Sequence, residues 1–308
     1  MIHTPTKTPW SHASVAESGG SAWAVEVTDG VFRNVLSDDY RPPALPVVAA
    51  KLVRLANDER TTLDRVCAVV EEDPILATRI LRIAQSAIYT RRGELHSIQQ
   101  AVVRLGTEQV RDIVLEDVLN MHIFRCRDYQ PIMERLRLHS VATAHVARRL
   151  AAEVDMPGQD VFLCGLLHDI GIAIALLALS EQPAPRPTFE QVSDALHREH
   201  PKLSSALATM WQLPGDVHAV VASHHDISAR GFPDRLPAAI CLSEQLVNER
   251  GLSIAPEAEA AFDRSSPFQV AQARVELGVD DALWARLGEL ADEVIAELLE
   301  DGGARGAA

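Results

Sequence analysis

The segment Cys164–Ala173, CGLLHDIGIA, places a histidine and an aspartate side by side within an otherwise apolar run. Burial of an imidazole and a carboxylate costs free energy unless each group finds a partner. His168 and Asp169 therefore either bind something, such as a metal ion, or satisfy each other and the backbone as a structural pair. The surrounding sequence has to decide between these two interpretations.

Helical patterns surround this segment on both sides. TTLDRVCAVVEED repeats apolar residues at intervals of three and four after Thr62, a candidate helix cap. DPILATRILRIAQSA opens with Asp73 as a cap and Pro74 at the first helical position. Ser97 and Gly106 are typical of the start and the end of another helix. Since no stretch shows the sustained period of two that marks a strand, the sequence predicts an all-α fold of many helices.

Charge limits the class of partner. The chain has 308 residues and a formal net charge of -14, with 29 lysines and arginines against 43 aspartates and glutamates. Neutralisation of phosphates by basic residues supplies most of the affinity of general nucleic-acid binders. We therefore expect no general nucleic-acid binding, although a local basic patch would still allow a small phosphate ligand such as a nucleotide.

Cysteines and apolar runs indicate the compartment. The four cysteines are far apart and form no CxxC pair, which predicts reduced, buried thiols in a cytoplasmic protein. The N-terminal segment MIHTPTKTPWSHAS lacks the apolar core of a signal peptide. The most apolar run, Ile170–Leu179, is too short to cross a bilayer. We expect no membrane association.

Further histidines gather on either side of the His168–Asp169 pair. One lies in the middle of the preceding helical pattern, one precedes a proline, and an adjacent pair ends a later helix. Imidazole and carboxylate ligands drawn from several helices suit a transition ion such as Fe, Mn or Zn. The residues predicted to bind metal are His139, His168, Asp169, His200, His224, His225 and Glu244.

Five of these residues also have a structural interpretation. His168 and Asp169 can hydrogen-bond each other or a backbone carbonyl. His200 can simply be held in an extended conformation before a proline. His224 and His225 can stabilise a helix C-terminus, where an imidazolium favours the helix dipole. Both interpretations stay open at this point.

GLLHDIG, with a histidine upstream and a His-His pair downstream, resembles the HD superfamily of metal-dependent phosphohydrolases. The fuller resemblance is to its HD-related output domain branch, the HDOD family, over about residues 41 to 250. The stretches that carry it are LPVVAAKLVRLAND, VVEEDPILATRILRIAQSA, SIQQAVVRLGTEQVRDIVL, LHSVATAHVARRLA, FLCGLLHDIGIAI, EHPKLSSALATMWQLPGDVHAVVASHHD and AAICLSEQLVNE.

The resemblance implies an HDOD fold in which an N-terminal helical lobe, residues 41–130, packs on an HD-like helical lobe, residues 131–250. Outside it we expect a partly disordered extension over residues 1–40, C-terminal helices over 251–300 and a disordered tail over 301–308. The resemblance further implies a bacterial, cytoplasmic signalling protein. Members of this branch are generally regarded as lacking catalysis, with the metal residues partly lost.

This sequence keeps residues that the enzymatic relatives use. By the same resemblance, His139 matches an early histidine of the HD-GYP cyclic-dinucleotide phosphodiesterases, His200 their HP step and His224–His225 their HH step, and GFPDRLP echoes their GYP loop. However, Ile172 stands where these enzymes have a lysine, and Glu244 where they have an aspartate. Loss of an ammonium group removes a stabiliser of developing negative charge, which favours metal binding over fast turnover.

Two functions are compatible with these features. The first is a bacterial regulatory module that acts through signalling protein partners, with a metal in the HD-like cleft; we expect output through a partner because the residues after 250 suffice for only a few helices. The second is a metal-dependent phosphohydrolase acting on a nucleotide or cyclic dinucleotide. The sequence assigns no catalytic residue, metal identity or oligomeric state.

Overall fold

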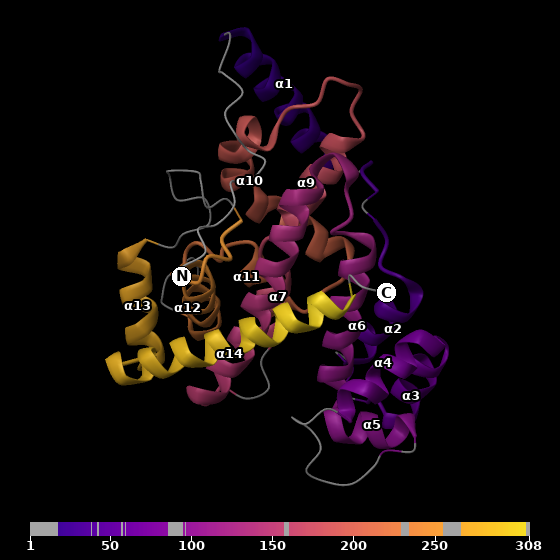
Figure 1. Ribbon diagram of the computed structural model, residues 1–308. Helices are drawn as coiled ribbons and strands as arrows, with labels where there is room; N and C mark the ends of the chain where they lie inside the picture. Colours follow the sequence, from indigo (N-terminus) through magenta and orange to yellow (C-terminus); the bar gives the residue numbers. More distant parts are fainter. Residues whose placement is uncertain are drawn as a thin grey trace, which may run out of the picture.

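The computed structural model describes residues 18–305, except for 38, 42, 57, 59, 86–94, 96, 157–159, 229–233 and 255–265. Within these residues the chain forms helices joined by loops and contains no strand (Figure 1). The prediction of an all-α fold is confirmed. The first three residues of GFPDRLP, at 231–233, lie outside the described residues.

The N-terminal lobe is a small bundle at one side of the molecule (Figure 1). Within it, α5 contacts α3, α4 and α6, and α2 contacts α3 and α6. The apolar face of each helix supplies the lobe's core, with Val70, Ile80 and Val102 fully buried. The helices of this lobe are α2 (Val47–Ala56), α3 (Leu63–Glu71), α4 (Pro74–Ala84), α5 (Ile98–Leu105) and α6 (Thr107–His122).

Two predicted helix caps in this lobe behave differently. The Asp73 side chain accepts hydrogen bonds from the amides of Ile75 and Leu76, at 3.0 and 3.2 Å. Thr62 occupies the same position before α3 but makes no capping hydrogen bond. We expect Asp73→Ala to lower the free energy of unfolding by about 1 kcal/mol. Thr62→Ala, the matched control, should change it by less than about 0.5 kcal/mol, and urea unfolding that ranks the two the other way would contradict this.

The HD-like lobe is built around two buried helices. Nearly every residue of α9 is buried, and α7 buries one long face that includes Leu136, Ala147 and Leu150. The helix α10 packs on α9, whereas α8 and α12 pack on α7. This lobe consists of α7 (Gln130–Glu153), α8 (Val161–Leu167), α9 (Ile170–Ser180), α10 (Phe189–Met210), α11 (Gly215–Val221) and α12 (Arg235–Glu249), preceded by the short 3₁₀ helix η1 (Arg127–Tyr129).

Among the described residues, one stretch is long and apolar enough to cross a membrane by length and composition alone. It runs from Val161 to Ser180, through α8 and α9, with a mean hydropathy of 2.2, and 94% of it is buried inside the protein. The run is longer than the sequence suggested because α8 continues into α9 across the His168–Asp169 pair. A stretch that packs against protein on all sides serves here as the core of the HD-like lobe.

Three further helices lie outside the two lobes in sequence. Part of the N-terminal extension forms α1 (Ser18–Val35), which packs on α9 and α10. At the other end, α13 (Pro267–Leu277) packs on α12, and α14 (Asp281–Arg305) crosses α7 and α12. The helix α14 continues past residue 301, where the sequence predicts a disordered tail, because each added residue of an existing helix gains a hydrogen bond.

Charged side chains join the two lobes. Arg111 of α6 is almost fully buried and contacts Asp112 and Asp160, each at 2.7 Å. Arg148 of α7 reaches the same Asp112 at 2.9 Å. Since a buried charge is costly without a partner, this network favours one arrangement of the lobes.

Candidate metal centre

Four separate segments of the HD-like lobe bring six of the predicted ligands together. His139 lies in the middle of α7, His168 and Asp169 at the turn between α8 and α9, and His200 in the middle of α10. The adjacent residues 224 and 225 follow the end of α11. All are buried except the partly exposed His225. We refer to His139, His168, Asp169, His200, His224 and His225 as the His/Asp cluster.

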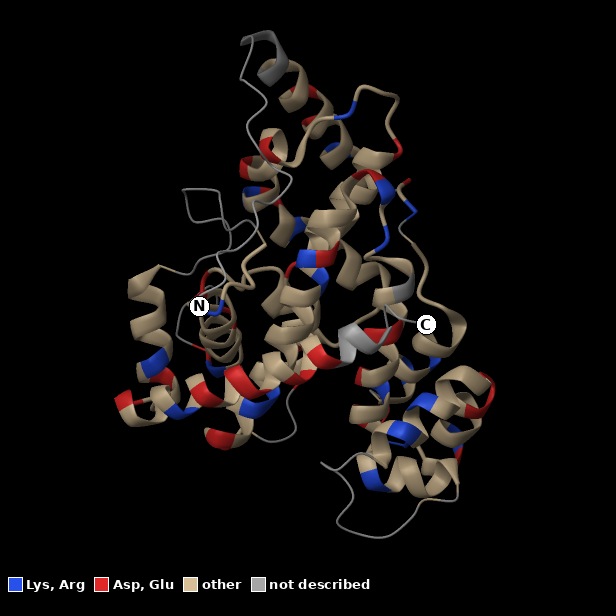
Figure 2. Cartoon of the chain, in the orientation of Figure 1, with Lys and Arg blue, Asp and Glu red and all other residues tan. Residues whose placement is uncertain are grey.

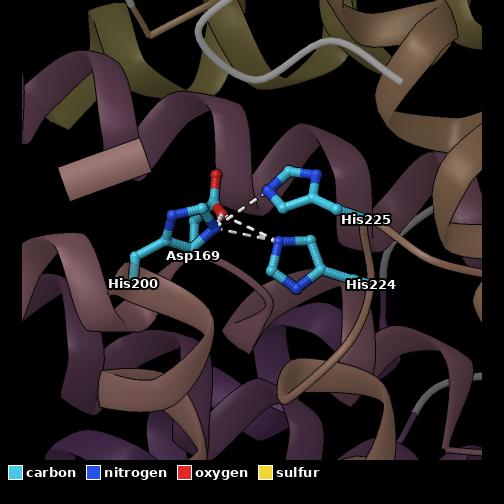
Figure 3. A group of neighbouring side chains, drawn as sticks. All are labelled: Asp169, His200, His224 and His225. Atoms are coloured by element: carbon cyan, nitrogen blue, oxygen red, sulfur yellow. Dashed lines mark hydrogen bonds and ion pairs between the residues drawn. The ribbon is translucent and has the colours of Figure 1, made fainter. Parts of the chain in front are cut away.

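Asp169 is the centre of the cluster. Its Oδ1 lies 3.1 Å from Nε2 of His200 and 3.3 Å from Nε2 of His224. Its Oδ2 lies 3.2 Å from Nε2 of His168 and 3.9 Å from Nε2 of His139. Figure 3 shows the carboxylate between His200 of α10 and the two histidines that follow α11. Potential ligand atoms therefore form two groups that share this one carboxylate: Asp169 with His200, His224 and His225, and Asp169 with His139 and His168.

Backbone carbonyls fix how four of the rings present their nitrogens. Nδ1 of His139 lies 3.0 Å from the carbonyl oxygen of Leu252, and Nδ1 of His168 lies 2.8 Å from that of Gly165. His200 makes the equivalent contact with the carbonyl of Leu196 in α10 at 3.0 Å, and His224 with that of Val221 at the end of α11 at 3.3 Å. A carbonyl can only accept, so Nδ1 carries a proton in each of these rings, and whenever the ring is neutral Nε2 directs a lone pair into the cluster.

These lone pairs converge more closely than hydrogen bonding can satisfy. Nε2 of His200 lies 3.1 Å from Nε2 of His224, 3.1 Å from Nε2 of His225 and 3.1 Å from the Asp169 carboxylate. One ring nitrogen has a single site for a proton or a lone pair, so it cannot bond all three neighbours. Neither oxygen of Asp169 accepts a well-aligned hydrogen bond from within the described residues. A cation at the common point satisfies all of these atoms, so the donor set fits a metal ion.

Burial keeps most of the imidazoles neutral. It lowers the pKa of His139 to about 4, helped by the nearby His168, and it lowers the pKa of His224 to about 4 as well. Burial and the neighbouring His224 also lower the pKa of His225. The neutral imidazole is the form in which histidine binds metals.

His168 and Asp169 form the charged centre. Burial opposes the charged form of His168, but the Asp169 carboxylate outweighs it and Glu244 adds to its effect, so the pKa of His168 rises to about 9. Burial also opposes ionisation of Asp169, but His168 and His200 hold the pKa of its carboxyl well below the usual range. A proton on His168 thus lies beside Asp169 where a metal ion would bind, and metal binding displaces it.

This geometry can now be set beside known proteins. A family model described as the HDOD domain matches residues 43–227, more than half of the chain. The chain belongs to the HDOD domain family. The resemblance inferred from the sequence motifs is therefore confirmed.

Solved structures share the fold of this HDOD protein. An HDOD domain protein of unknown function from Geobacter sulfurreducens aligns with a TM-score of 0.62 and 22% identity, over 88% of this chain and 97% of that one. A candidate metal-dependent phosphohydrolase from Shewanella amazonensis SB2B aligns with a TM-score of 0.59 and 21% identity, over 82% and 99%. A candidate signal transduction protein from Marinobacter aquaeolei VT8 aligns with a TM-score of 0.61 and 21% identity, over 90% of this chain and 65% of that one. At these identities the likeness shows the fold alone.

A relative by sequence is longer than this chain. An uncharacterized protein of Treponema pallidum (strain Nichols) is 25% identical over 196 residues, which are 60% of this chain. The match spans 38% of the relative's own length.

Glu244 and Ile172, two further positions singled out from the sequence, lie outside the two groups of ligand atoms. Glu244 is fully buried on α12 and close enough to raise the pKa of His168, but it belongs to neither group of converging ligand atoms. Its role as a ligand stays a prediction. Ile172 is fully buried among the apolar residues of α9, so its position supplies no cation to the cluster.

Sequence reasoning missed several residues around the cluster. His197 lies one helical turn before His200, and its ring centroid is 5.3 Å from that of His225; the spacing of three was the available signal. Ser204 accepts a hydrogen bond from the amide of Gly171 at 2.9 Å and donates to the carbonyl of His168 at 3.0 Å. This hydroxyl fixes the turn that carries the His-Asp pair, and no motif indicated it.

Proposed function

We propose that this HDOD protein is a bacterial, cytoplasmic regulatory protein that holds one or two transition-metal ions in its His/Asp cluster and acts through a signalling partner. The observation that carries the proposal is the convergence of Nε2 lone pairs on the Asp169 carboxylate. Nitrogen and oxygen donors without cysteine favour Fe, Mn or Zn. The chain's acidic net charge supports a protein partner over a nucleic acid. Figure 2 shows acidic residues on helices of both lobes.

Burial favours holding the ion over rapid turnover. Both carboxylate oxygens of Asp169 are inaccessible to solvent, and four of the five cluster histidines are at most 1% exposed. Catalytic metal sites keep a position open for water or substrate, whereas closed sites serve structural or regulatory roles. Ile172 adds to this argument because it leaves the position of the phosphodiesterase lysine apolar.

A phosphohydrolase is the second candidate, favoured by the complete histidine set around a shared carboxylate. A bound ion would supply a water of lowered pKa for attack at phosphorus. The chain's own residues would hold that ion and place its ligands. Hydrolysis of a cyclic dinucleotide by the wild-type protein with Mn or Fe, absent in Asp169→Ala, would establish this candidate in place of the non-catalytic one.

Elemental analysis tests the metal. We expect wild-type protein, purified without an affinity tag, to carry about one or two Fe, Mn or Zn ions per chain. We expect His168→Ala to lose them, because this substitution removes one Nε2 ligand beside Asp169. His122→Ala, an exposed histidine at the end of α6, serves as the control and should keep the ions. A wild-type protein that holds no metal, and whose stability is unchanged by Mn or a chelator, would make the cluster a structural one.

A further inference from the structure

Two contacts tie the C-terminal part of the chain, beyond the matched residues 43–227, to the His/Asp cluster. Nδ1 of His139 donates to the carbonyl oxygen of Leu252 at 3.0 Å. Nε2 of Gln269, in the first turn of α13, donates to the carbonyl oxygen of His225. Residues outside the family match thus hold one histidine from each group of ligand atoms.

The position of the Leu252 carbonyl depends on how α12 ends. Gly251 adopts a left-handed conformation with φ of 78°, its amide donates to Asn248 at 3.0 Å, and the amide of Leu252 donates to Val247 at 3.3 Å. This pair of hydrogen bonds is a Schellman motif, which reverses the chain direction at a helix C-terminus. The reversed segment then presents two successive carbonyls to α7, and the second, of Ser253, accepts from Arg135 one turn before His139 at 2.9 Å.

Arg250, the last residue before this reversal, is held by α14. Its guanidinium makes two parallel contacts with the Asp292 carboxylate, Nε to Oδ1 at 2.7 Å and Nη2 to Oδ2 at 3.2 Å. Nη2 also donates to the carbonyl of Gly288 at 2.5 Å, and Nη1 donates to Leu246 at 3.0 Å. Two-point contact between arginine and carboxylate fixes orientation as well as distance. We refer to Arg250, Gly288 and Asp292 as the Arg250 latch.

The latch needs a glycine in α14. A Cβ atom at position 288 would lie 2.9 Å from Nη2 of Arg250. The obstructing atom is the end of a flexible side chain, so a larger residue displaces the guanidinium while the backbone packing of α14 stays in place. Glycine in a helix interior is otherwise unfavourable, which makes its presence here consistent with a role in the latch.

We infer that α14 positions the His139 ring of the metal cluster through the Arg250 latch, the C-terminal end of α12 and the Leu252 carbonyl. Arg250, Gly288 and Asp292 are positioning residues: they touch no cluster atom but hold the carbonyl that fixes the His139 tautomer and orientation. A contact that lifts α14 releases this carbonyl and weakens the His139–His168–Asp169 group. The consequence for metal affinity rests on the proposed function, whereas the positioning of the ring does not.

Gly288→Ala and Asp292→Asn test the latch in the full-length chain. The first favours the helix and displaces the guanidinium, whereas the second removes the charge of the guanidinium's partner. An effect shared by both variants therefore comes from the latch and not from the stability of α14. Arg286→Gln is the matched control, because Arg286 pairs α14 with Glu153 of α7 at 2.8 Å and lies outside the latch. In the metal-free chain, nitrogen NMR of the imidazoles should show the His139 Nδ1 proton exchanging at least about tenfold faster in both latch variants, and unchanged in the control.

Titration with Co²⁺ as the probe gives the second readout. We expect the two latch variants to bind Co²⁺ about 10-fold or more weakly than wild type, with the control within twofold, since loss of an outer hydrogen bond to a ligating histidine costs 10- to 100-fold in affinity. If the His139 Nδ1 proton exchanges at the wild-type rate in both latch variants, the inference that the latch positions the His139 ring is wrong. If the wild type binds no Co²⁺, the proposed metal function fails, and the exchange rates alone still decide the positioning.

Discussion

Asp169→Asn should remove bound metal from both groups of ligand atoms at once. The side chain keeps its size but loses the negative charge that four imidazole Nε2 atoms face at 3.1 to 3.9 Å. Since both groups share this carboxylate, no ion keeps a complete ligand set. We expect metal affinity to fall by more than about 100-fold, beyond the loss caused by an outer-sphere change. Elemental analysis and Co²⁺ titration of the purified variant measure this.

Variants that alter only one group of ligand atoms test whether the loss in Asp169→Asn arises because both groups share this carboxylate. His225→Gln affects only the group with His200 and His224, and His139→Gln only the group with His168. Each should weaken binding in one group and leave the other. Asp128→Asn, at an exposed carboxylate in η1, should leave metal content unchanged. Wild-type metal content in Asp169→Asn would disprove the central role of the carboxylate, and circular dichroism confirms that the variant is folded.

Among the stability variants considered, Gly171→Ala should cause the largest decrease in the free energy of unfolding. A Cβ atom at Gly171 would lie 2.3 Å from the carbonyl oxygen of His200 and 2.8 Å from the amide and hydroxyl of Ser204. The first two are backbone atoms of α10, so relief requires α9 and α10 to separate, and this also moves His200 away from Asp169. We expect a decrease of about 3 kcal/mol or more in the free energy of unfolding, the upper end of what overpacking costs.

Gly215→Ala provides the matched control. Gly215 opens α11, and nothing lies within 4 Å of an added Cβ atom. Alanine is the better helix former, so this variant should equal or slightly exceed wild-type stability. Urea unfolding of both variants measures the difference. Similar midpoints for Gly171→Ala and the wild type would show that α9 and α10 are not in the close contact described.

The sequence could predict whatever depends on local chemistry. Asp73 and Ser97 cap their helices as expected because a cap involves residues two or three positions apart. The motif around His168 and Asp169 indicated the candidate metal site because neighbouring polar groups in an apolar run need partners. The structure then brings together the histidines that the sequence could only place in separate helices.

The remaining features depend on contacts between distant segments. The carbonyl that orients His139 belongs to Leu252, more than one hundred residues later, and no periodicity relates the two. No periodicity relates the hydroxyl of Ser204 to the turn at His168 either, although that hydroxyl fixes the turn. Thr62 has the right residue type and position for a cap, but its side chain makes no capping hydrogen bond. The local pattern alone therefore predicted a hydrogen bond that the structure does not contain. The signalling partner and the bound metal stay predictions.

The apolar stretch from Val161 to Ser180 has a consequence for synthesis on the ribosome. Two of the helices that cover it, α10 and α12, follow it in the chain, and α12 is complete only at Glu249. At a translation rate of roughly 5 to 20 residues per second, the stretch waits about 3 to 14 seconds for that helix. During this interval a nascent segment with the hydropathy of a membrane span has only earlier helices such as α1 and α7 to cover it. The newly made chain should therefore depend on a chaperone or a targeting factor that keeps this segment from aggregating until the last helix of the lobe emerges.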